Sequence, residues 1–148
     1  MDVKIYTAGK MGGLSYGEQM CWREELEMWV NKRVEQYGSR KMPRFIHPPL
    51  FYSYEKREEK SDKEVLLWEF GQISQSQIVV VNLDGILSSA GTLMELGAVA
   101  ALNQKSSNYI MVIGIGKAVD YPWVNEVLLR REDTIEDAAT YIARYGLV

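Results

Sequence analysis

Hydrophobic residues gather in four short runs that are separated by longer, mixed segments. The runs are Val3–Tyr6, Met42–His47, Ile78–Leu83 and Tyr109–Ile115. Short apolar runs that are bounded by turn residues are typical of strands. The third run, IVVVNL, is β-branched and nearly continuous, as in a central parallel strand that helices cover on both faces. The pattern therefore predicts four strands, one of them at the centre of a sheet.

Two of the segments between these runs repeat apolar residues at helical intervals, and both begin with the same start signal. Ser15–Glu18 and Ser61–Glu64 each have the Ser-x-x-Glu spacing of a capping box. The first apolar stripe continues to Gly38, and the second continues to about Ser74. The spacing predicts a helix over each segment.

The remainder of the chain adds two helices and one weaker apolar run. Thr92–Leu102, TLMELGAVAAL, carries small residues that allow a helix to pack closely on a sheet, and Thr134 opens a last amphipathic helix. Between them, a loop with Pro122 precedes a weaker apolar run at Val127–Leu129. Strands that alternate with helices favour a parallel sheet. We therefore expect one α/β domain over residues 1–148: an open, mostly parallel five-stranded sheet with helices on both faces, Rossmann-like or flavodoxin-like.

Composition narrows the classes of function. Hydrophobic residues make up 47% of the chain and charged residues 25%, as in an ordinary globular protein with a real core. The formal net charge is -3, from 17 basic and 20 acidic residues. A chain without an excess of basic residues lacks the electrostatic footprint of a protein that wraps nucleic acid. We expect a small-molecule ligand and no nucleic acid polymer as partner.

The chain has a single cysteine, Cys21, and a single histidine, His47. One cysteine makes no internal disulfide and no thiolate zinc site, so we expect a reducing cytoplasm and neither a metal nor another cofactor. No stretch approaches the run of about 18 apolar residues that a membrane helix needs, and the N-terminus has no signal-peptide pattern. We expect a protein that is neither exported nor anchored to a membrane.

In an open parallel sheet, ligands bind at the carboxyl ends of the strands, near the point where the strand order reverses. This favours three segments: Thr7–Gly13, Asp84–Gly91 and Thr92–Glu95. Glu95 lies about one turn inside the predicted helix, where the helix dipole and free N–H groups favour an ionised carboxylate. Such a carboxylate can act as a nucleophile or a base, although acidic residues near helix starts also serve stability alone.

Two stretches resemble the signature regions of a known enzyme family. They are Lys4–Gly13, KIYTAGKMGG, and Glu69–Leu102, which contains SQSQIVVVNLDGILSSAGTLMELGAVAAL. Both are similar to regions of the nucleoside 2-deoxyribosyltransferase family, which includes the deoxynucleoside 5′-monophosphate N-glycosidases. The similarity follows the same order along nearly the whole chain, and GTLMELG is its more specific part.

The resemblance implies a catalytic group of three residues. Glu95 matches the family nucleophile, which attacks the anomeric carbon and forms a glycosyl-enzyme intermediate. Tyr6 matches a tyrosine whose hydroxyl orients that nucleophile. Glu69 stands where the family usually has an aspartate that helps to protonate the leaving base. Gln77 stands where many relatives have an aspartate, and it is assigned no catalytic role.

The resemblance also implies a binding end for the substrate. Ser89 matches a position that is aspartate in transferases of free nucleosides and serine in relatives that act on 5′-monophosphates. A serine hydroxyl and N–H groups at a helix start accept a phosphate, although Ser89 equally suits a helix N-cap. Asn125 corresponds to a polar residue that family dimers lend to the neighbouring subunit, which implies a homodimer or a larger homo-oligomer. The implied substrate-binding residues are Gly9, Lys10, Gly12, Gly13, Ser89, Gly91 and Asn125.

Three further features have open interpretations. The polar loop from Phe51 to Lys60 is a candidate for a mobile lid. His47 ends the second strand near the same rim, but a lone histidine is more often structural than catalytic. On the first helix, Trp22 lies on the apolar stripe, and Arg23 faces either solvent or a phosphate.

These observations predict a cytoplasmic enzyme of nucleotide salvage. It would cleave the N-glycosidic bond of a (deoxy)nucleoside or nucleotide through a glycosyl-enzyme intermediate on Glu95. An alternative with the same chemistry is hydrolysis of a nucleoside 5′-monophosphate. An alternative from a different functional class is a nucleotide sensor without catalytic activity, because Glu69 and Gln77 both depart from the family pattern.

Overall fold

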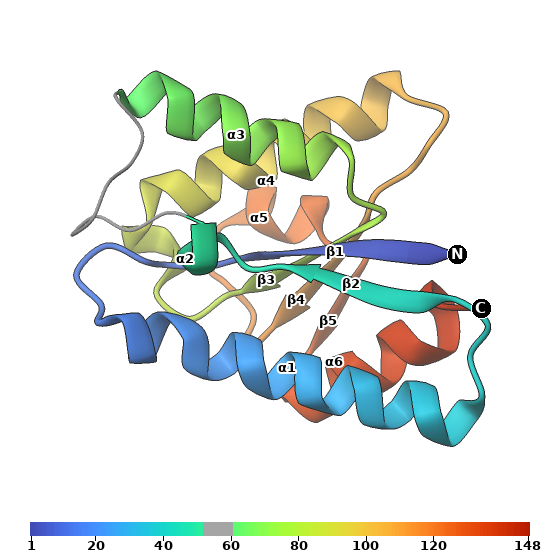
Figure 1. Ribbon diagram of the computed structural model, residues 1–148. Helices are drawn as coiled ribbons and strands as arrows, with labels where there is room; N and C mark the ends of the chain where they lie inside the picture. The colour runs from blue at the N-terminus through green and yellow to red at the C-terminus, as the bar shows by residue number, and fades with distance from the viewer. Residues whose placement is uncertain (52–60) are drawn as a thin grey trace.

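The computed structural model describes residues 1–51 and 61–148 (Figure 1). The candidate lid at 51–60 therefore lies outside the described residues, except for its first position, Phe51. Across the described part of the chain, no helix is long and apolar enough to cross a membrane.

The core of the molecule is one sheet of five parallel strands, in the order β2-β1-β3-β4-β5. The strands are β1 (Asp2–Ala8), β2 (Met42–Ile46), β3 (Ile78–Asn82), β4 (Met111–Ile115) and β5 (Arg130–Glu132). This order is that of the flavodoxin-like doubly wound sheets. It confirms the predicted fold class and places the buried IVVVN run of β3 at the centre.

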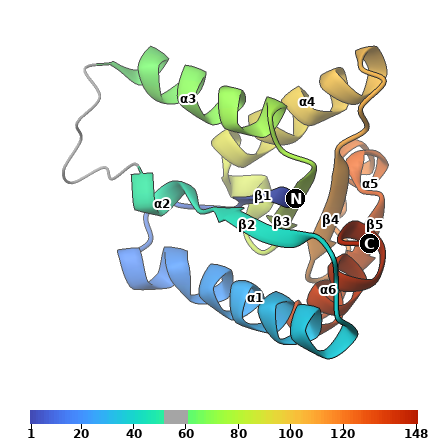
Figure 2. The same ribbon diagram turned by 45° about the vertical axis from the view of Figure 1, so that its right-hand side comes forward.

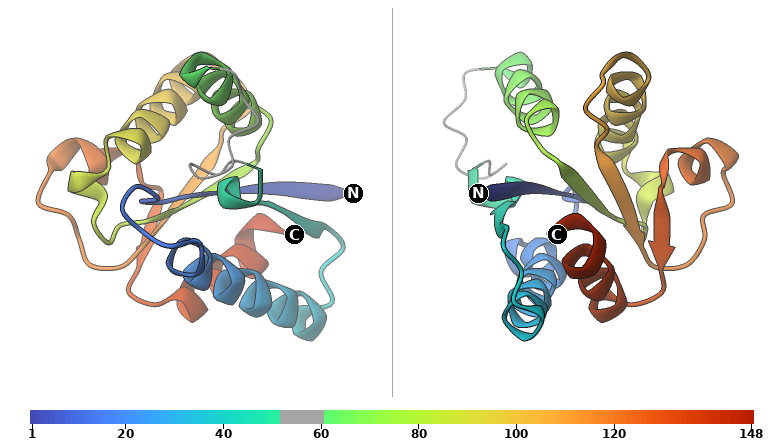
Figure 3. Two further views of the ribbon diagram at one scale, coloured as in Figure 1. Left: turned by 60° about the vertical axis from the view of Figure 1, so that its left-hand side comes forward. Right: turned by 90° about the vertical axis from the view of Figure 1, so that its right-hand side faces the viewer.

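Helices cover both faces of the sheet (Figures 2 and 3). The first face carries α1 (Tyr16–Tyr37), α6 (Ile135–Tyr141) and the π-helical turn η2 (Ile142–Gly146). The second face carries α3 (Asp62–Ser74), α4 (Ala90–Lys105) and α5 (Pro122–Val127). Two short elements, α2 (Pro48–Phe51) and η1 (Ile86–Ser88), follow β2 and β3. Alternate residues of β3 point into the two layers, Val80 toward α1 and α6 and Val79 toward α3 and α4.

Three helices, α1, α3 and α6, begin after the capping residues that the sequence predicted, Ser15, Ser61 and Thr134, whereas α4 begins two residues before the predicted Thr92 and α5 was not predicted. Ser15 and Glu18 form a reciprocal capping box: the Glu18 N–H donates to Ser15 Oγ at 3.2 Å, and the Ser15 N–H donates to Glu18 Oε1 at 3.0 Å. Gly38 ends α1 with a φ of 62°, a left-handed conformation that glycine adopts without strain. Thr134 caps α6 by accepting from the N–H of Asp137.

The last strand differs from the apolar pattern. The weaker apolar run Val127–Leu129 contains the last residue of α5 and the two residues after it. The strand that follows is polar, Arg130–Glu132. This segment becomes a strand because it pairs with β4, where Gly114 lies opposite Arg131. At the edge of the sheet a short charged strand also discourages pairing with another chain.

The direction of the strand order changes between β1 and β3. From β1 the chain moves to β2 on one side, and from β3 it moves to β4 and β5 on the other. The loops that leave the carboxyl ends of β1 and β3 therefore diverge, and a crevice opens between them. One of these loops begins with Gly9, where an added Cβ would lie 2.9 Å from Cζ2 of Trp22 and 3.4 Å from Cβ of Asn82.

We predict that Gly9→Ala destabilises the protein by about 1–3 kcal/mol, because the new methyl group overpacks against the indole ring of Trp22. Gly12→Ala is the matched control: nothing lies within 4 Å of its added Cβ, and Gly12 has no positive φ. It should leave stability unchanged or raise it by up to about 1 kcal/mol. Urea denaturation measures both free energies of unfolding, and equal costs would contradict the proposed reason for glycine at position 9.

Candidate active site

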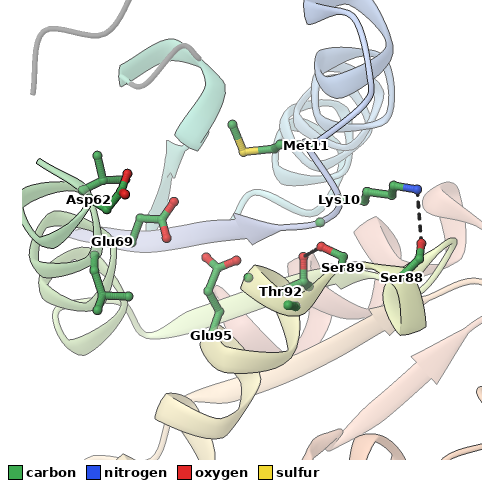
Figure 4. A pocket seen from close by; sticks show the side chains of 14 residues that line it. Lys10, Met11, Asp62, Glu69, Ser88, Ser89, Thr92 and Glu95 are labelled. Carbon is green, nitrogen blue, oxygen red and sulfur yellow. Dashed lines mark hydrogen bonds between the residues drawn. The ribbon is translucent and has the colours of Figure 1, made fainter.

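A cleft of about 330 Å³ opens at the carboxyl end of the sheet. Its walls are the loop after β1, one face of α3, and the turn that leads into α4 (Figure 4). Seven of the residues that sequence analysis singled out line it: Gly9, Lys10, Gly12, Glu69, Ser89, Gly91 and Glu95. The cleft therefore lies where the topology of the sheet predicts a ligand site.

Three of the residues that sequence analysis singled out lie elsewhere. Tyr6 is completely buried beneath the cleft and reaches it only through Glu95. Gly13 occupies the turn before α1 with a φ of 78° and is not part of the lining. Asn125 is exposed on α5, where its side-chain amide donates to the carbonyl of Val119 at 2.9 Å. Within one subunit Asn125 is thus not a cleft residue, and its contribution to a neighbouring subunit stays a prediction.

The central contact of the site joins Tyr6 to Glu95. The Tyr6 hydroxyl donates to Oε2 of Glu95 at 2.5 Å. The residues come from β1 and α4, and they are only 0% and 7% exposed to solvent. The contact gives the carboxyl group one fixed orientation, with the second oxygen left for the cleft.

The sequence suggested that the start of the helix keeps Glu95 ionised. In the structure, other groups control its charge. Glu95 lies in the second turn of α4, which begins at Ala90, and the influence of a helix dipole falls off within the first turn. Burial, and after it the nearby charge of Glu69, raises the pKa of Glu95 to about 8. The Tyr6 hydrogen bond and the charge of Arg23 act in the opposite direction and lower it.

Glu69 is the second carboxyl group of the cleft. It lies on α3, half-buried, and Figure 4 shows its carboxyl group turned toward that of Glu95. Burial raises the pKa of Glu69 as well. Two carboxylates that repel one another and are both partly removed from water do not ionise together at neutral pH. The pair therefore holds one proton between them.

Burial and the two carboxyl groups raise the pKa of Tyr6 well above its ordinary value of 10. The hydroxyl therefore keeps its proton throughout the physiological range. Tyr6 acts as a permanent hydrogen-bond donor to Glu95 and not as an acid or a base.

The other end of the cleft is lined by hydroxyl groups and one lysine. Lys10 Nζ donates to Ser88 Oγ at 3.1 Å, and the hydroxyl of Ser89 pairs with that of Thr92 at 2.7 Å. Ser89 occupies the N-cap position of α4, but its side chain makes no capping hydrogen bond. Its hydroxyl is therefore positioned as part of the cleft wall and not as a helix cap.

Sequence analysis missed the apolar and acidic lining that α3 supplies. Asp62, Val65, Leu66 and Glu69 all line the cleft. Their spacing of three, four and seven residues places them on one face of a helix. Because Glu69 was already singled out, this periodicity was the signal that could have identified the other three.

Arg23 faces neither solvent nor the cleft, contrary to both interpretations of the sequence. It is completely buried. Its Nε donates to Thr7 Oγ1 at 3.1 Å, and Nη2 donates to the carbonyl of Gly9 at 3.4 Å. The periodicity of α1 contained this information, because Arg23 falls on the buried stripe with Met20 and Leu26.

His47 and Gln77 have structural contacts. His47 is buried, with Nδ1 2.9 Å from Thr7 Oγ1 and Nε2 3.0 Å from Glu27 Oε2, and burial lowers its pKa. Gln77 precedes β3, at the end of the sheet opposite the cleft, and its Oε1 accepts from the N–H of Lys4 at 2.6 Å. Among the described residues, no group of three or more histidine, cysteine, aspartate or glutamate side chains is arranged to hold a metal ion.

Comparisons with known proteins bear on the fold alone. No protein-family model matches the chain, and no curated protein matches it. Among solved structures, the chain is similar to a conserved protein from Enterococcus faecalis V583. The TM-score is 0.69 at 16% sequence identity, and the match covers 97% of this chain and 99% of that protein. The Enterococcus protein therefore shares the architecture over its whole length.

Proposed function

We propose that this protein is a cytoplasmic enzyme that cleaves the N-glycosidic bond of a nucleoside or nucleotide, with Glu95 as its nucleophile. The observation that carries the proposal is the buried Tyr6–Glu95 hydrogen bond with Glu69 opposite it in an open cleft. The resemblance to the nucleoside 2-deoxyribosyltransferases implies the same roles for these three residues. An oriented carboxylate facing a second carboxyl group is also the arrangement that glycosidic bond cleavage requires.

The proposed reaction has two steps. In the first, the bond between the anomeric carbon and the base nitrogen breaks, Glu69 gives its proton to the departing base, and Glu95 forms an ester bond to the anomeric carbon. In the second, the nitrogen of another base, or water, attacks that carbon and releases Glu95. Glu69 takes the proton of the attacking group. Tyr6 holds one oxygen of Glu95 throughout, so that the other is aimed at the sugar.

The proton shared by the two carboxyl groups suits this reaction. The productive form has Glu95 ionised and Glu69 protonated. Burial favours the proton on Glu95, and the hydrogen bond from Tyr6 opposes this preference. The reaction therefore depends on the singly protonated pair, because the doubly protonated pair has no nucleophile and the doubly ionised pair has no acid.

The size and lining of the cleft suit a single nucleoside or nucleotide. Its volume of about 330 Å³ lies at the lower end of the range for small-molecule sites. Val65 and Leu66 line the cleft from α3, within one turn of Glu69, and offer an apolar wall to a flat base. Lys10 and Ser89 lie at the other end (Figure 4). The lysine and the start of α4 favour a phosphate there, and this supports 5′-monophosphate hydrolysis as a second candidate activity.

A homodimer is part of the proposal. Trp123 and Met94 are 72% and 53% exposed, and Trp123 lines an apolar groove of about 460 Å³ between α4 and α5. Exposed apolar surface of this kind is typical of protein interaction sites. Asn125 lies on the same short helix as Trp123, which agrees with its expected role at the neighbouring subunit's cleft.

The test of the proposed function is Glu95→Gln. We predict that it lowers the rate of base release by about a thousandfold or more, because the covalent route is lost. The ordinary pKa of the carboxyl is 4.5 and folding raises it to about 8. Its stabilising contribution is therefore present below pH 4.5 and lost as the pH rises through 8, so the variant should gain more in Tm at pH 9 than at pH 5.

Glu35→Gln is the matched control, because Glu35 is exposed on α1 and does not line the cleft. It should change neither the rate nor the Tm. The measurement is base release from a panel of nucleosides and 5′-monophosphates, with and without a second free base, which also separates transfer from hydrolysis. Near-normal turnover by the Glu95→Gln protein would refute the mechanism. Binding without turnover by the unmodified protein would support the idle sensor instead.

We predict a bell-shaped dependence of rate on pH, with the alkaline fall near pH 8, where the pair loses its last proton. In Glu69→Gln the alkaline fall should disappear, because no acid remains to be ionised. The pKa of Glu95 should also fall, because the charge of Glu69 no longer opposes its ionisation. The remaining slow activity should rise with pH to a plateau, and substrates with better leaving bases should lose less.

Asp62→Asn is the control for this profile, since Asp62 lines the cleft from the same face of α3. It should keep the alkaline fall. Initial rates between pH 4 and pH 10 provide the comparison. If the Glu69→Gln protein kept an alkaline fall near pH 8, Glu69 would not be the acid.

We predict that a 5′-monophosphate binds about tenfold or more tightly than its parent nucleoside, because hydrogen bonds to a charged group contribute about 1.5–3 kcal/mol each. Ser89→Asp should reverse the preference by placing two negative charges together. Ser107→Asp, at an exposed position beyond the amino ends of the strands, is the control and should change nothing. Calorimetric titrations measure the affinities, and equal affinities in the unmodified protein would mean that the cleft holds no phosphate site.

A further inference from the structure

Arg23 and Glu95 are a buried base and a buried acid that contact consecutive residues at the end of β1. Among the described residues, the buried polar side chains are Thr7, Arg23, His47, Ser76, Thr92 and Glu95. Of these, Arg23 carries a positive charge at neutral pH and Glu95 is the acidic member. Arg23 is 0% exposed and Glu95 is 7% exposed. Bulk water therefore screens neither the charge of Arg23 nor that of Glu95 when Glu95 is ionised.

Every acceptor that Arg23 contacts is neutral. Its Nε and Nη2 donate to the hydroxyl and the carbonyl of Thr7, at 3.1 and 3.5 Å, and Nη2 also donates to the carbonyl of Gly9. Nη1 donates to the carbonyl of Gln19. Within residues 1–51 and 61–148 no carboxylate lies at ion-pair distance from Arg23. The guanidinium is thus fixed by dipoles, and no adjacent anion neutralises its unit of charge.

Arg23 and Glu95 contact neighbouring residues of β1. Thr7, which holds the guanidinium on the α1 side of the sheet, follows Tyr6, which donates to Glu95 on the α4 side. Three groups act on the charge of Glu95: Tyr6 from β1, Glu69 from α3 and Arg23 from α1. Arg23 is the cation among them. The interaction is mutual, because Glu95 and Tyr6 raise the pKa of Arg23, which burial lowers to about 10.

We propose that Arg23 is a positioning residue that acts on Glu95 through the sheet, as the buried counter-charge that permits the Glu95 carboxylate to exist. This role of Arg23 is more than holding the loop after β1 in place, because neutral hydrogen bonds alone could hold that loop. Glu69 opposes ionisation of Glu95 from across the cleft, and Arg23 supports it from below. The consequence for catalysis rests on the proposed function, whereas the electrostatic coupling itself does not.

A double-mutant cycle on protein stability tests the coupling without any substrate. Arg23→Met removes the charge and keeps the apolar stem, and it is made with either Glu or Gln at position 95. At pH 9, where Glu95 is ionised, Arg23→Met should lower the Tm by about 3 °C or more beyond its effect in the Gln background. At pH 5, where Glu95 is protonated, the two effects should be equal. A coupling that is the same at both pH values, or absent at pH 9, would overturn the proposal.

A second measurement does not require the loss of Arg23. Thr7→Val removes the hydroxyl that Arg23 contacts and retains the charge. NMR titration of the Glu95 carboxyl should show a pKa within about 0.3 units of the parent in this variant, and a rise on the order of one unit in Arg23→Met. Arg23→Lys, which keeps a positive charge, should show little of that rise, with a Glu95 pKa close to the parent value. If Arg23→Met does not fold, Arg23→Gln replaces it: a Glu95 pKa that rises by about half a unit or more supports the proposal, and an unmoved pKa overturns it.

The kinetic readout separates this proposal from the proposed function. If the protein cleaves nucleosides, Arg23→Met should lower kcat by about tenfold for each unit by which the pKa of Glu95 rises, with little change in KM. An effect confined to KM would mean that Arg23 only shapes the loop that holds the substrate. If no variant cleaves any nucleoside, the stability cycle and the NMR titration still decide whether Arg23 and Glu95 are coupled.

Discussion

The hydrogen bond between Tyr6 and Glu95 is the contact on which the site depends. It joins residues 89 positions apart in the chain, one at the end of β1 and the other inside α4. It exists because β1 and β3 are neighbours in the sheet, so that the helix after β3 lies over the end of β1. The same topology opens the crevice in which Glu69 faces Glu95. One pairing of strands therefore creates both the orientation of the carboxyl group and the space in front of it.

Burial makes the Glu95 carboxyl group difficult to ionise. Of the surrounding groups, some oppose its ionisation and others favour it. Burial and Glu69 raise the pKa of Glu95, whereas Tyr6 and Arg23 lower it. A group that is held between such opposing influences titrates near neutral pH, where both of its charge states are accessible. The cost is stability, because a buried carboxylate weakens the folded state as the pH rises. Strongly perturbed pKa values cluster at functional sites.

The cleft also differs from one end to the other. α3 supplies apolar side chains and a carboxyl group, and the loop after β1 and the start of α4 supply a lysine and hydroxyl groups. A nucleotide has the same polarity along its length, from a flat base to a charged phosphate. The sugar would then lie in the middle, beside Glu95. The cleft and a nucleotide therefore change from apolar to charged in the same direction, which supports a nucleotide as the proposed substrate.

The sequence by itself determined the features that depend on neighbouring residues in the chain. The capping box at Ser15–Glu18, the left-handed Gly38 and the buried run of β3 were predictable, because their interactions span a few residues or repeat along one element. The strand Arg130–Glu132, the buried position of Arg23 and the protonation of Glu95 were decided only by the tertiary structure. A polar segment becomes a strand when a partner strand offers hydrogen bonds, and the charge of a side chain depends on which groups surround it. Those partners come from distant parts of the chain, and no local sequence pattern shows which distant residues become neighbours in the folded protein.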